Sequence, residues 1–404
     1  DKYAIAILHN GGTVRYTRAK RTVIAEVEQL QKNKDITIYI SAATCRDGKN
    51  PFEIAHKRVL EAANIGYEKL RHRHQNYWKT FWKRSWIKCN DTDIEKPWYL
   101  SNFLCGSILR PGKTSPGLQG PWIRENFPPW SADFHGNINI QSVYHGLFGS
   151  NRMELFEPYA RLYHDMLPIC RRETKKYFGT EGARLPHAGD IDGHEITLPP
   201  WIPLTLSIAP SAWIARLFWW AYQHLLDKSF LKNVAYPILR DVALFYEGLL
   251  KLTGKGKDGK WLVEPSIYGE AYCTSIDGWG TNSSYDVASM MAVFQQAADA
   301  AEILGIDSSY VEEWRRILAD LPKLPVDKEN VWLMWPKHPK NQRVGAGSFF
   351  HAVCPCEIAG LFNGTPKLRK QALDTWRKFA RKSTDSPWCG GTPIAAAARL
   401  GDAR

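Results

Sequence analysis

Hydrophobic and polar residues alternate along the first 45 or so positions, as they do in strands with one buried face. The alternation predicts strands at 3–8, 13–17, 21–27 and 36–43. Asn10-Gly11-Gly12 is typical of a tight hairpin turn, because asparagine and glycine adopt the positive φ angles that such turns require. We expect residues 1–50 to be the C-terminal part of a β-sandwich domain.

From residue 51 the hydrophobic residues recur every three to four positions, which is the period of an amphipathic helix. Residues 51–96 are predicted to form a helical linker. Further helices are predicted at 97–109, 150–177, 208–226, 229–251, 284–304, 308–319, 348–363, 365–382 and 391–400. In the clearest pair, Ser229 is a candidate N-cap and Pro237 a candidate kink of the second helix.

Long connections rich in Pro, Gly, Trp and His separate the helix pairs, at 110–148, 179–207, 254–283 and 322–347. Connections of this length are uncommon in a compact domain unless they carry function. Because short and long connections alternate, we expect the long ones to gather at one end of the helices. The pattern predicts a mainly α fold, a toroid-type barrel of helical hairpins over residues 97–404, preceded by the remnant of a β-sandwich.

Residues 120–140 interrupt the helical pattern with prolines, two tryptophans and a series of polar side chains. Asp133, His135, Asn137 and Asn139 are each two positions apart, so an extended backbone places all four on one polar face. Two amides on one face can bind a water molecule or a sugar hydroxyl. An edge strand with a solvated face explains the same pattern, and both interpretations stay open here.

The chain has 404 residues, of which 44% are hydrophobic, which excludes a disordered protein. Lysine and arginine exceed aspartate and glutamate by 12, an excess that we expect to be spread along the chain in local clusters. Its 17 Trp and 17 Tyr residues favour a carbohydrate or nucleic-acid ligand, because flat rings stack on sugars and bases. The basic and aromatic segment 72–84 fits nucleic acid, but a solvated amphipathic helix explains it equally well.

Eight scattered cysteines without a CxxC pair indicate neither a zinc site nor a small disulfide scaffold. No apolar run is long enough for a membrane span, and none is expected. The first residues lack the regions of a signal peptide and begin within a predicted strand, so we expect a chain cut from a longer one. The sequence leaves the oligomeric state open.

Several stretches resemble family 95 of the glycoside hydrolases, in the same order throughout: residues 37–44, 66–87, 118–122, 128–130, 137–139, 213–250, 265–270 and 283–304. That family contains inverting α-L-fucosidases and related α-L-galactosidases, with an N-terminal β-domain, an (α/α)6 barrel and a C-terminal β-domain. The resemblance implies an exo-acting inverting glycosidase for a terminal α-L-fucose-like or related L-sugar, with no cofactor and no metal. The implied partner is an oligosaccharide or polysaccharide, not a nucleic acid.

An inverting glycosidase needs a protonated acid at the glycosidic oxygen and a base-activated water on the opposite face of the sugar. Glu270 matches the general acid of the family, and apolar neighbours favour its protonated form. Glu264 is the local alternative. Asn137 and Asn139 match the asparagine pair that, in the family, orients the water together with an aspartate.

The family segment that carries this aspartate, similar to Phe-Gln-Ile-Asp-Gly-Asn-Phe-Gly, is not found before Arg404. We expect a fragment whose (α/α)6 barrel is incomplete at its C-terminal end, because the predicted helices make fewer than six pairs. If another acid takes the role instead, Asp133 is the best internal substitute. His351 matches the place of a His-Arg-His-like motif but keeps only one histidine, so specificity for fucose does not follow from the resemblance.

Other candidates are assigned to substrate binding by their place in the long connections. They are Trp122, Trp130, Asp133, His135, His187, Asp190, Trp201, Asp286 and His351. Structural alternatives stay open for some of them: tryptophans as core residues, ordinary turn chemistry at Asp192-Gly193 beside Asp190, and Asp286 in helix capping. An extracellular or periplasmic location is expected, as for glycosidases of polymeric glycans. The alternatives are a catalytically inactive glycan-binding relative and, less favoured, a basic nucleic-acid-binding protein.

Overall fold

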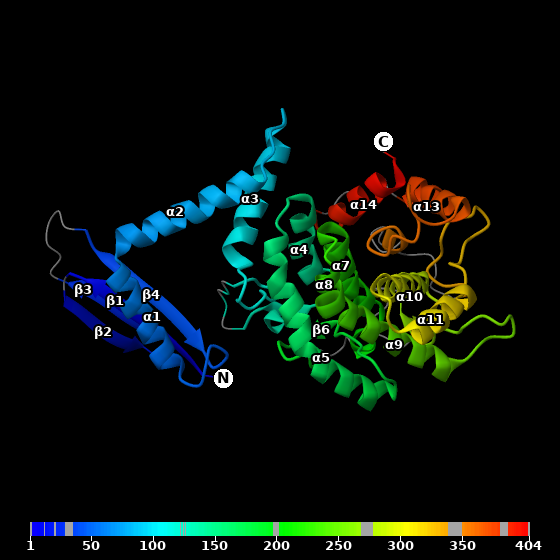
Figure 1. The fold of residues 1–404 in the computed structure, drawn as a ribbon, viewed down its shortest axis with the longest axis horizontal. Coiled ribbons are helices and arrows are strands. Elements are labelled where there is room, and N and C mark those ends of the chain that lie inside the picture. The colour runs from blue at the N-terminus through cyan, green and yellow to red at the C-terminus, as the bar shows by residue number, and fades with distance from the viewer. Residues whose placement is uncertain are drawn as a thin grey trace. The chain divides into compact units, whose positions relative to one another are not determined.

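The computed structural model describes residues 2–11, 13–19, 22–28, 35–121, 123, 125, 127–196, 202–267, 278–337, 350–379 and 387–402. The chain forms two compact units, Asp1–Ile87 and Lys88–Arg404, whose elements are labelled in Figure 1. The sequence-based boundaries at 50 and 96 stay a prediction of the domain organisation. Within the described ranges, no helix is both long and apolar enough to cross a membrane.

The first unit contains four strands and two helices: β1 (Tyr3–Asn10), β2 (Thr13–Ala19), β3 (Thr22–Glu28), β4 (Thr37–Thr44), α1 (Pro51–Ile65) and α2 (Tyr67–Arg84). β1 pairs with β4 and β2 with β3, both antiparallel, and α1 packs on β1 and β4. The hairpin turn predicted at residues 10–12 is therefore wrong. The chain reverses between β2 and β3, where Ala19 pairs with Thr22. Membership of a β-sandwich stays a prediction.

The second unit is mainly helical. Its α-helices within the described residues are α3 (Thr92–Ile108), α4 (Asn139–Gly149), α5 (Glu157–Phe178), α6 (Ile202–Thr205), α7 (Ala209–Leu225), α8 (Lys228–Phe230), α9 (Tyr236–Thr253), α10 (Ser284–Leu304), α11 (Ser308–Asp320), α13 (Pro366–Phe379) and α14 (Pro387–Leu400). α7, α9 and α10 are buried along most of their length, whereas α5 and α11 bury one face and leave the other more exposed. α10 packs against α7, α9 and α11, so the mostly buried helices lie together in the interior of this unit.

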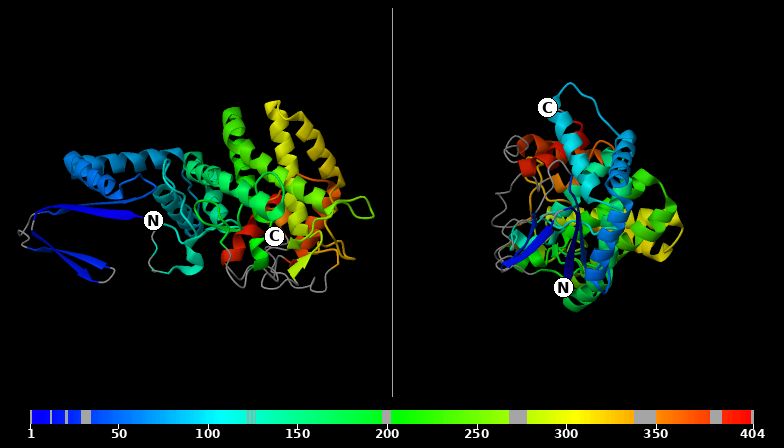
Figure 2. Two further views of the ribbon diagram at one scale, coloured as in Figure 1. Left: turned by 90° about the horizontal axis from the view of Figure 1, so that it is seen from below. Right: turned by 90° about the vertical axis from the view of Figure 1, so that its left-hand side faces the viewer.

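Short strands occupy the connections that precede α4, α7 and α10. β5 (Phe134–His135) comes before α4, β6 (Ala188–Gly189) before α7, and β7 (Ser266–Ile267) and β8 (Trp279–Gly280) before α10. β5 pairs with β6 and β7 with β8, both antiparallel. In the left view of Figure 2, β8 lies at one end of the helices of this unit. These connections carry the predicted site residues.

Two helix predictions are corrected. α4 occupies the end of the predicted long connection 110–148 and extends one residue beyond it. The helix predicted at 348–363 is wrong, because of its described residues only Phe350–Ala352 are helical, as a 3-10 turn named η5. Pro355 lacks a backbone N–H, and Gly360 lowers helix propensity, so both disfavour a helix there.

The start of the α9 hairpin also differs from the prediction. Asp227, not Ser229, is the N-cap residue, since its Oδ1 accepts the backbone N–H of Ser229 at 2.7 Å. Pro237 lies in the first turn of α9, and the kink predicted there stays a prediction. A π-helical turn, Leu231–Ala235, joins α8 to α9.

Candidate functional site

A buried carboxylate meets an imidazole just before α4. Asp133 is 2% exposed, and its two oxygens lie 3.0 and 3.2 Å from Nδ1 of His135. Because an ionised carboxylate only accepts hydrogen bonds, Nδ1 is the donor and Nε2 of a neutral ring is left as an acceptor. The pair therefore fixes the tautomer and the orientation of His135.

The chain enters this pair through a strained turn. In the short 3-10 segment η1 (Pro129–Ala132), Trp130, Ser131 and Ala132 have φ angles of 55°, 55° and 52°. Left-handed backbone is unfavourable for residues other than glycine, so the surrounding structure must hold it. Strain of this kind clusters at functional sites. The Trp130 side chain is half exposed, and its ring lies 5.7 Å from that of His135.

The connections before α4 and α7 are joined at this point. His135 pairs with Ala188, and the N–H of Gly136 donates to the carbonyl of His187 at 2.6 Å. A Cβ atom on Gly136 would lie 2.5 Å from the carbonyl oxygen of Pro186, so no larger residue fits without a shift. The rings of His135 and His187 are 5.1 Å apart and nearly perpendicular. Two loops predicted to carry site residues thus meet at their buried ends.

His187 is 3% exposed, and neither ring nitrogen has a hydrogen-bond partner among the described residues. Burial, together with the neighbouring His135 and Arg184, holds the pKa of His187 well below its usual value, so the ring is neutral. Buried polar atoms without partners are rare in proteins and are commonly satisfied by water or a ligand. This ring is therefore a candidate contact for a bound hydroxyl group.

A buried ion pair supports the His187 segment. Arg184 and Glu195 lie 2.9 Å apart, and the Glu195 carboxylate accepts the backbone N–H groups of His187 and Ala188, each at 3.0 Å. Burial raises the pKa of Glu195 although Arg184 and these hydrogen bonds oppose it. The ion pair thus fixes the backbone of β6. The sequence analysis missed both residues, because nothing in their local pattern distinguishes them from other polar loop residues.

The predicted strand through residue 140 ends at His135, so the four alternating polar residues do not share one strand face. Asn137 lies in the turn that follows and is 8% exposed, and Asn139 is the first residue of α4. The alternative of a solvated edge strand is also wrong, because Asp133, His135 and Asn137 are all buried. The polar residues gather at the start of a helix instead.

Asp286 is a second buried carboxylate, in the first turn of α10 and 1% exposed. Its Oδ2 accepts from Oγ of Ser266 at 2.7 Å, from the N–H of Ile267 at 2.9 Å and from Oγ of Ser283 at 3.2 Å. Burial raises the pKa of Asp286 to about 7, although these hydrogen bonds lower it. The N-cap of α10 is Ser283, whose side chain accepts the N–H of Asp286.

The Asp286 hydrogen bonds hold β7 against the start of α10. β7 ends at Ile267, shortly before Glu270 in the sequence. Glu270 itself lies outside the described residues, as do Trp122 and Trp201. Asp286 therefore anchors the backbone that leads into the segment carrying the predicted acid. The sequence analysis did not predict Ser266 and Ser283 as site residues. The only signal for them was their position next to Pro265 and close to Asp286.

His351 lies in the interior, 3% exposed. Its Nε2 is 2.9 Å from Oγ of Ser289, and its ring lies 3.9 Å from that of Tyr285 and 5.6 Å from that of Trp213. Burial lowers the pKa of His351 to about 3, so the ring is neutral at physiological pH. Its role in substrate binding stays a prediction.

Asp190 shapes a turn after β6. Its Oδ1 accepts the N–H groups of Asp192, Gly193 and His194, each at 2.9 Å, and its Oδ2 lies 3.1 Å from Nδ1 of His194. Burial raises the pKa of this carboxyl, but the hydrogen bonds outweigh it and the net pKa is lowered. Asp190 is therefore held as an anion beside the predicted substrate loop.

A family model described as "Glycosyl hydrolase family 95 catalytic domain" matches residues 90–404, more than half of the chain. The chain belongs to glycosyl hydrolase family 95. The resemblance inferred from the sequence is thereby confirmed.

Two curated relatives of this family 95 chain carry fucosidase names. "Alpha-L-fucosidase 2" of Arabidopsis thaliana is 29% identical over 300 residues, which cover 70% of this chain and 34% of the relative. "Probable alpha-fucosidase A" of Aspergillus niger is 24% identical over 244 residues, which cover 54% of this chain and 30% of the relative. The chain thus spans about a third of the length of these relatives.

A solved structure, "Putative kojibiose phosphorylase from human microbiome", has a similar fold, with a TM-score of 0.69 at 12% sequence identity. The match covers 99% of this chain and 58% of the other. At this identity the likeness concerns the fold alone. The predicted mainly helical, toroid-type fold preceded by strands is confirmed, and the number of helix pairs stays a prediction.

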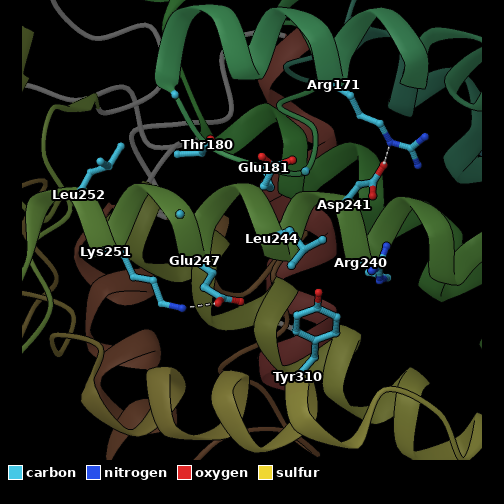
Figure 3. A pocket seen from close by; sticks show the side chains of 13 residues that line it. Arg171, Thr180, Glu181, Arg240, Asp241, Leu244, Glu247, Lys251, Leu252 and Tyr310 are labelled. Atoms are coloured by element: carbon cyan, nitrogen blue, oxygen red, sulfur yellow. Dashed lines mark hydrogen bonds and ion pairs between the residues drawn. The ribbon is translucent and has the colours of Figure 1, made fainter.

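The family 95 domain also has a polar pocket of about 810 Å³ between α5, α9 and α11, shown in Figure 3. Four of its charged residues pair with one another: Arg171 Nε lies 2.6 Å from Asp241 Oδ2, and Lys251 Nζ lies 2.6 Å from Glu247 Oε1. Of the predicted site residues that the structure describes, none lines this pocket. Among the same described ranges, no cluster of three or more His, Cys, Asp or Glu could hold a metal ion.

Proposed function

We propose that this family 95 protein is an exo-acting inverting glycosidase that removes a terminal α-L-fucose-like or related L-sugar residue from glycans. The observation that carries the proposal is the buried polar group of Asp133, His135 and His187, where the connections before α4 and α7 join. The fucosidase names of both relatives favour a fucoside. An extracellular or periplasmic location is part of the same proposal.

In this mechanism Glu270 protonates the leaving oxygen, while Asn137 and Asn139 orient the attacking water. Support for Glu270 comes from its place after β7, whose backbone Asp286 holds with a 2.9 Å hydrogen bond to Ile267. Support for the asparagines comes from their place next to His135, at the start of α4. The groups would then act on opposite faces of the sugar, as inversion requires.

Asp133 is an unsuitable direct base, because its side chain is fully buried and both oxygens lie against His135. We infer that it acts through His135, whose Nε2 remains as an acceptor toward a hydroxyl or water. His187, with unpartnered ring nitrogens, and the half-exposed Trp130 complete the described part of the substrate site in this proposal. Trp122, Trp201, Asp190, Asp286 and His351 stay predicted binding residues.

The test compares Glu270→Gln with Glu264→Gln as a matched control. Hydrolysis is measured on a fucosylated oligosaccharide and on an aryl α-L-fucoside, and NMR identifies the first anomer released. General acid catalysis contributes ~10²–10⁴-fold, so Glu270→Gln should lose that much on the oligosaccharide and less on the aryl glycoside, whose leaving group departs as a stable anion. Glu264→Gln should retain activity. Release of the retained anomer, or equal small losses on both substrates, contradicts the proposal.

A catalytically inactive glycan-binding relative is the second candidate. The burial of Asp133 favours it, because this leaves no carboxylate near His135, among the described residues, that can act directly as the base. A screen of aryl α-L-glycosides separates the two. Binding of L-fucose without hydrolysis of any glycoside supports the inactive relative.

Asn139→Ala should impair the hydrolysis of oligosaccharide and aryl substrates alike if the protein is an enzyme, because the attacking water must be positioned for both.

A further inference from the structure

Charge is divided unequally between the two units. Residues 1–87 contain 17 Lys and Arg against 8 Asp and Glu, an excess of 9 out of the 12 of the whole chain. Residues 88–404 contain 36 against 33 and are close to neutral. The expectation of an excess spread along the chain is therefore corrected. A concentrated positive charge on one unit raises the local concentration of anionic partners.

More than half of this excess lies on α2. Lys69, Arg73, Lys79 and Lys83 are all exposed, and we call these four residues the basic stripe. On a helix they fall within about 120° of the circumference and extend over about 21 Å. None of the four forms an ion pair or a side-chain hydrogen bond within the described chain. The single acidic residue of α2, Glu68, pairs with Arg71 instead, at 2.8 Å.

The aromatic residues of α2 lie on the other side of the helix. Trp78 stacks on Trp82 with centroids 5.9 Å apart, Tyr77 stacks on Phe81 at 6.0 Å, and Phe81 is buried. The rings thus pack on one another and do not stand between the cations. Proteins that bind single-stranded nucleic acid combine cations with aromatic platforms for the bases. The basic stripe presents charge and lysine or arginine stems, which suits a polymer recognised by its repeated anionic groups.

We propose that the basic stripe binds an anionic polysaccharide, one with sulfate or carboxylate groups repeated along its chain. The choice of a glycan rests on the proposed glycosidase function, whereas the preference for a polyanion rests on the stripe alone. Such contacts hold the polymer by its internal residues while its terminal sugar is processed elsewhere. Because the stripe is exposed, the interaction weakens with salt, over a Debye length of about 8 Å at physiological ionic strength.

The experiment measures binding of the 404-residue protein to fluorescent dextran sulfate, uncharged dextran and duplex DNA, at several salt concentrations. The stripe variant is Lys69→Gln/Arg73→Gln/Lys79→Gln/Lys83→Gln. A matched control removes the same charge from four exposed lysines of the second unit, as Lys228→Gln/Lys232→Gln/Lys257→Gln/Lys323→Gln. Each lost contact should lower the salt dependence of log K by about 0.7–0.9, so the stripe variant should lose about 3 and bind at least about tenfold more weakly. The control should stay within about twofold.

Three results overturn the proposal: failure of the unchanged protein to bind dextran sulfate, equal losses in the two variants, or tighter binding of DNA than of dextran sulfate at equal charge. The last result identifies a nucleic-acid partner.

The rate of hydrolysis of a small aryl α-L-fucoside should be equal in both variants and in the unchanged protein. If hydrolysis is absent in all three while dextran sulfate binding persists, the glycosidase function fails and the stripe stands. A double variant, Lys79→Gln/Lys83→Gln, replaces the fourfold one if circular dichroism shows misfolding.

Discussion

The regions around Asp133 and Asp286 each contain a buried carboxylate near the start of a helix. They differ in the groups to which the carboxylate is hydrogen-bonded. Both side chains are almost completely buried, and both lie where a connection enters a helix, Asp133 shortly before α4 and Asp286 in the first turn of α10. Asp133 meets the imidazole of His135, whereas Asp286 meets two serine hydroxyls and a backbone N–H. An imidazole can carry charge and accept at its second nitrogen, so the first pair can direct chemistry. Neutral donors can only hold a position, so the second carboxylate anchors the backbone.

The largest effect is expected for Asp133→Asn. An amide that donates to Nδ1 of His135 selects the opposite tautomer and removes the acceptor at Nε2, as known for catalytic histidines. If this acceptor serves the reaction, kcat/KM on an aryl α-L-fucoside should fall about 10²–10³-fold. Steady-state kinetics measures the loss.

The control is a double-mutant cycle with His135→Gln. If Asp133 acts only through His135, the double variant should be no less active than His135→Gln alone. Additive losses would make the two residues independent. Unchanged kinetics with a lower melting temperature would reduce Asp133 to a structural role, which makes the two regions equivalent.

Asp286→Asn should change the pH dependence of stability. The folded-state pKa of about 7 lies above the ordinary value, so the protonated form is favoured by folding. The stability that the raised pKa contributes is fully present below about pH 4 and is lost as the pH rises through 7. Between these values the unfolded state has already released the proton that the native state keeps. The asparagine variant, which does not titrate, should therefore gain about 4 kcal/mol of unfolding free energy relative to the parent between pH 4 and pH 8. Urea unfolding at several pH values measures this, and a parallel pH dependence in both proteins contradicts it.

The smallest effect is expected for Ser266→Ala. The change removes the hydrogen bonds from Oγ to Asp286 at 2.7 Å and from the N–H of Ser283 at 2.9 Å. Loss of such bonds typically costs about 1 kcal/mol of unfolding free energy, measured by chemical denaturation. Ser229→Ala is the control, because its hydroxyl lies on the surface and its N–H bond to Asp227 remains. Equal stability of both variants would show that the β7 anchor is redundant.

The elements with a local signature were predictable from the sequence. The strands of the first unit follow from hydrophobic residues at every second position. Helices such as α7, α10 and α11 follow from hydrophobic residues at every third or fourth position. α4 was missed because polar residues at alternate positions before it imitate a strand, and because its N-cap, Ile138, offers no capping side chain. The family resemblance located the candidate residues and not their neighbours. The contact of His135 with His187 spans 52 positions and depends on the absence of a Cβ at Gly136, which no local pattern encodes.

The pairing of β5 with β6 makes the two loops one structural module. Their register is set by residues 134–135 and 188–189 and by the close approach of Gly136 to Pro186. The lengths of both loops can therefore vary only outside these segments. A chimaera that imports one loop from a relative and keeps the other will place mismatched backbones in contact. Exchange of specificity between members of the family should accordingly transplant residues 130–139 and 184–195 together.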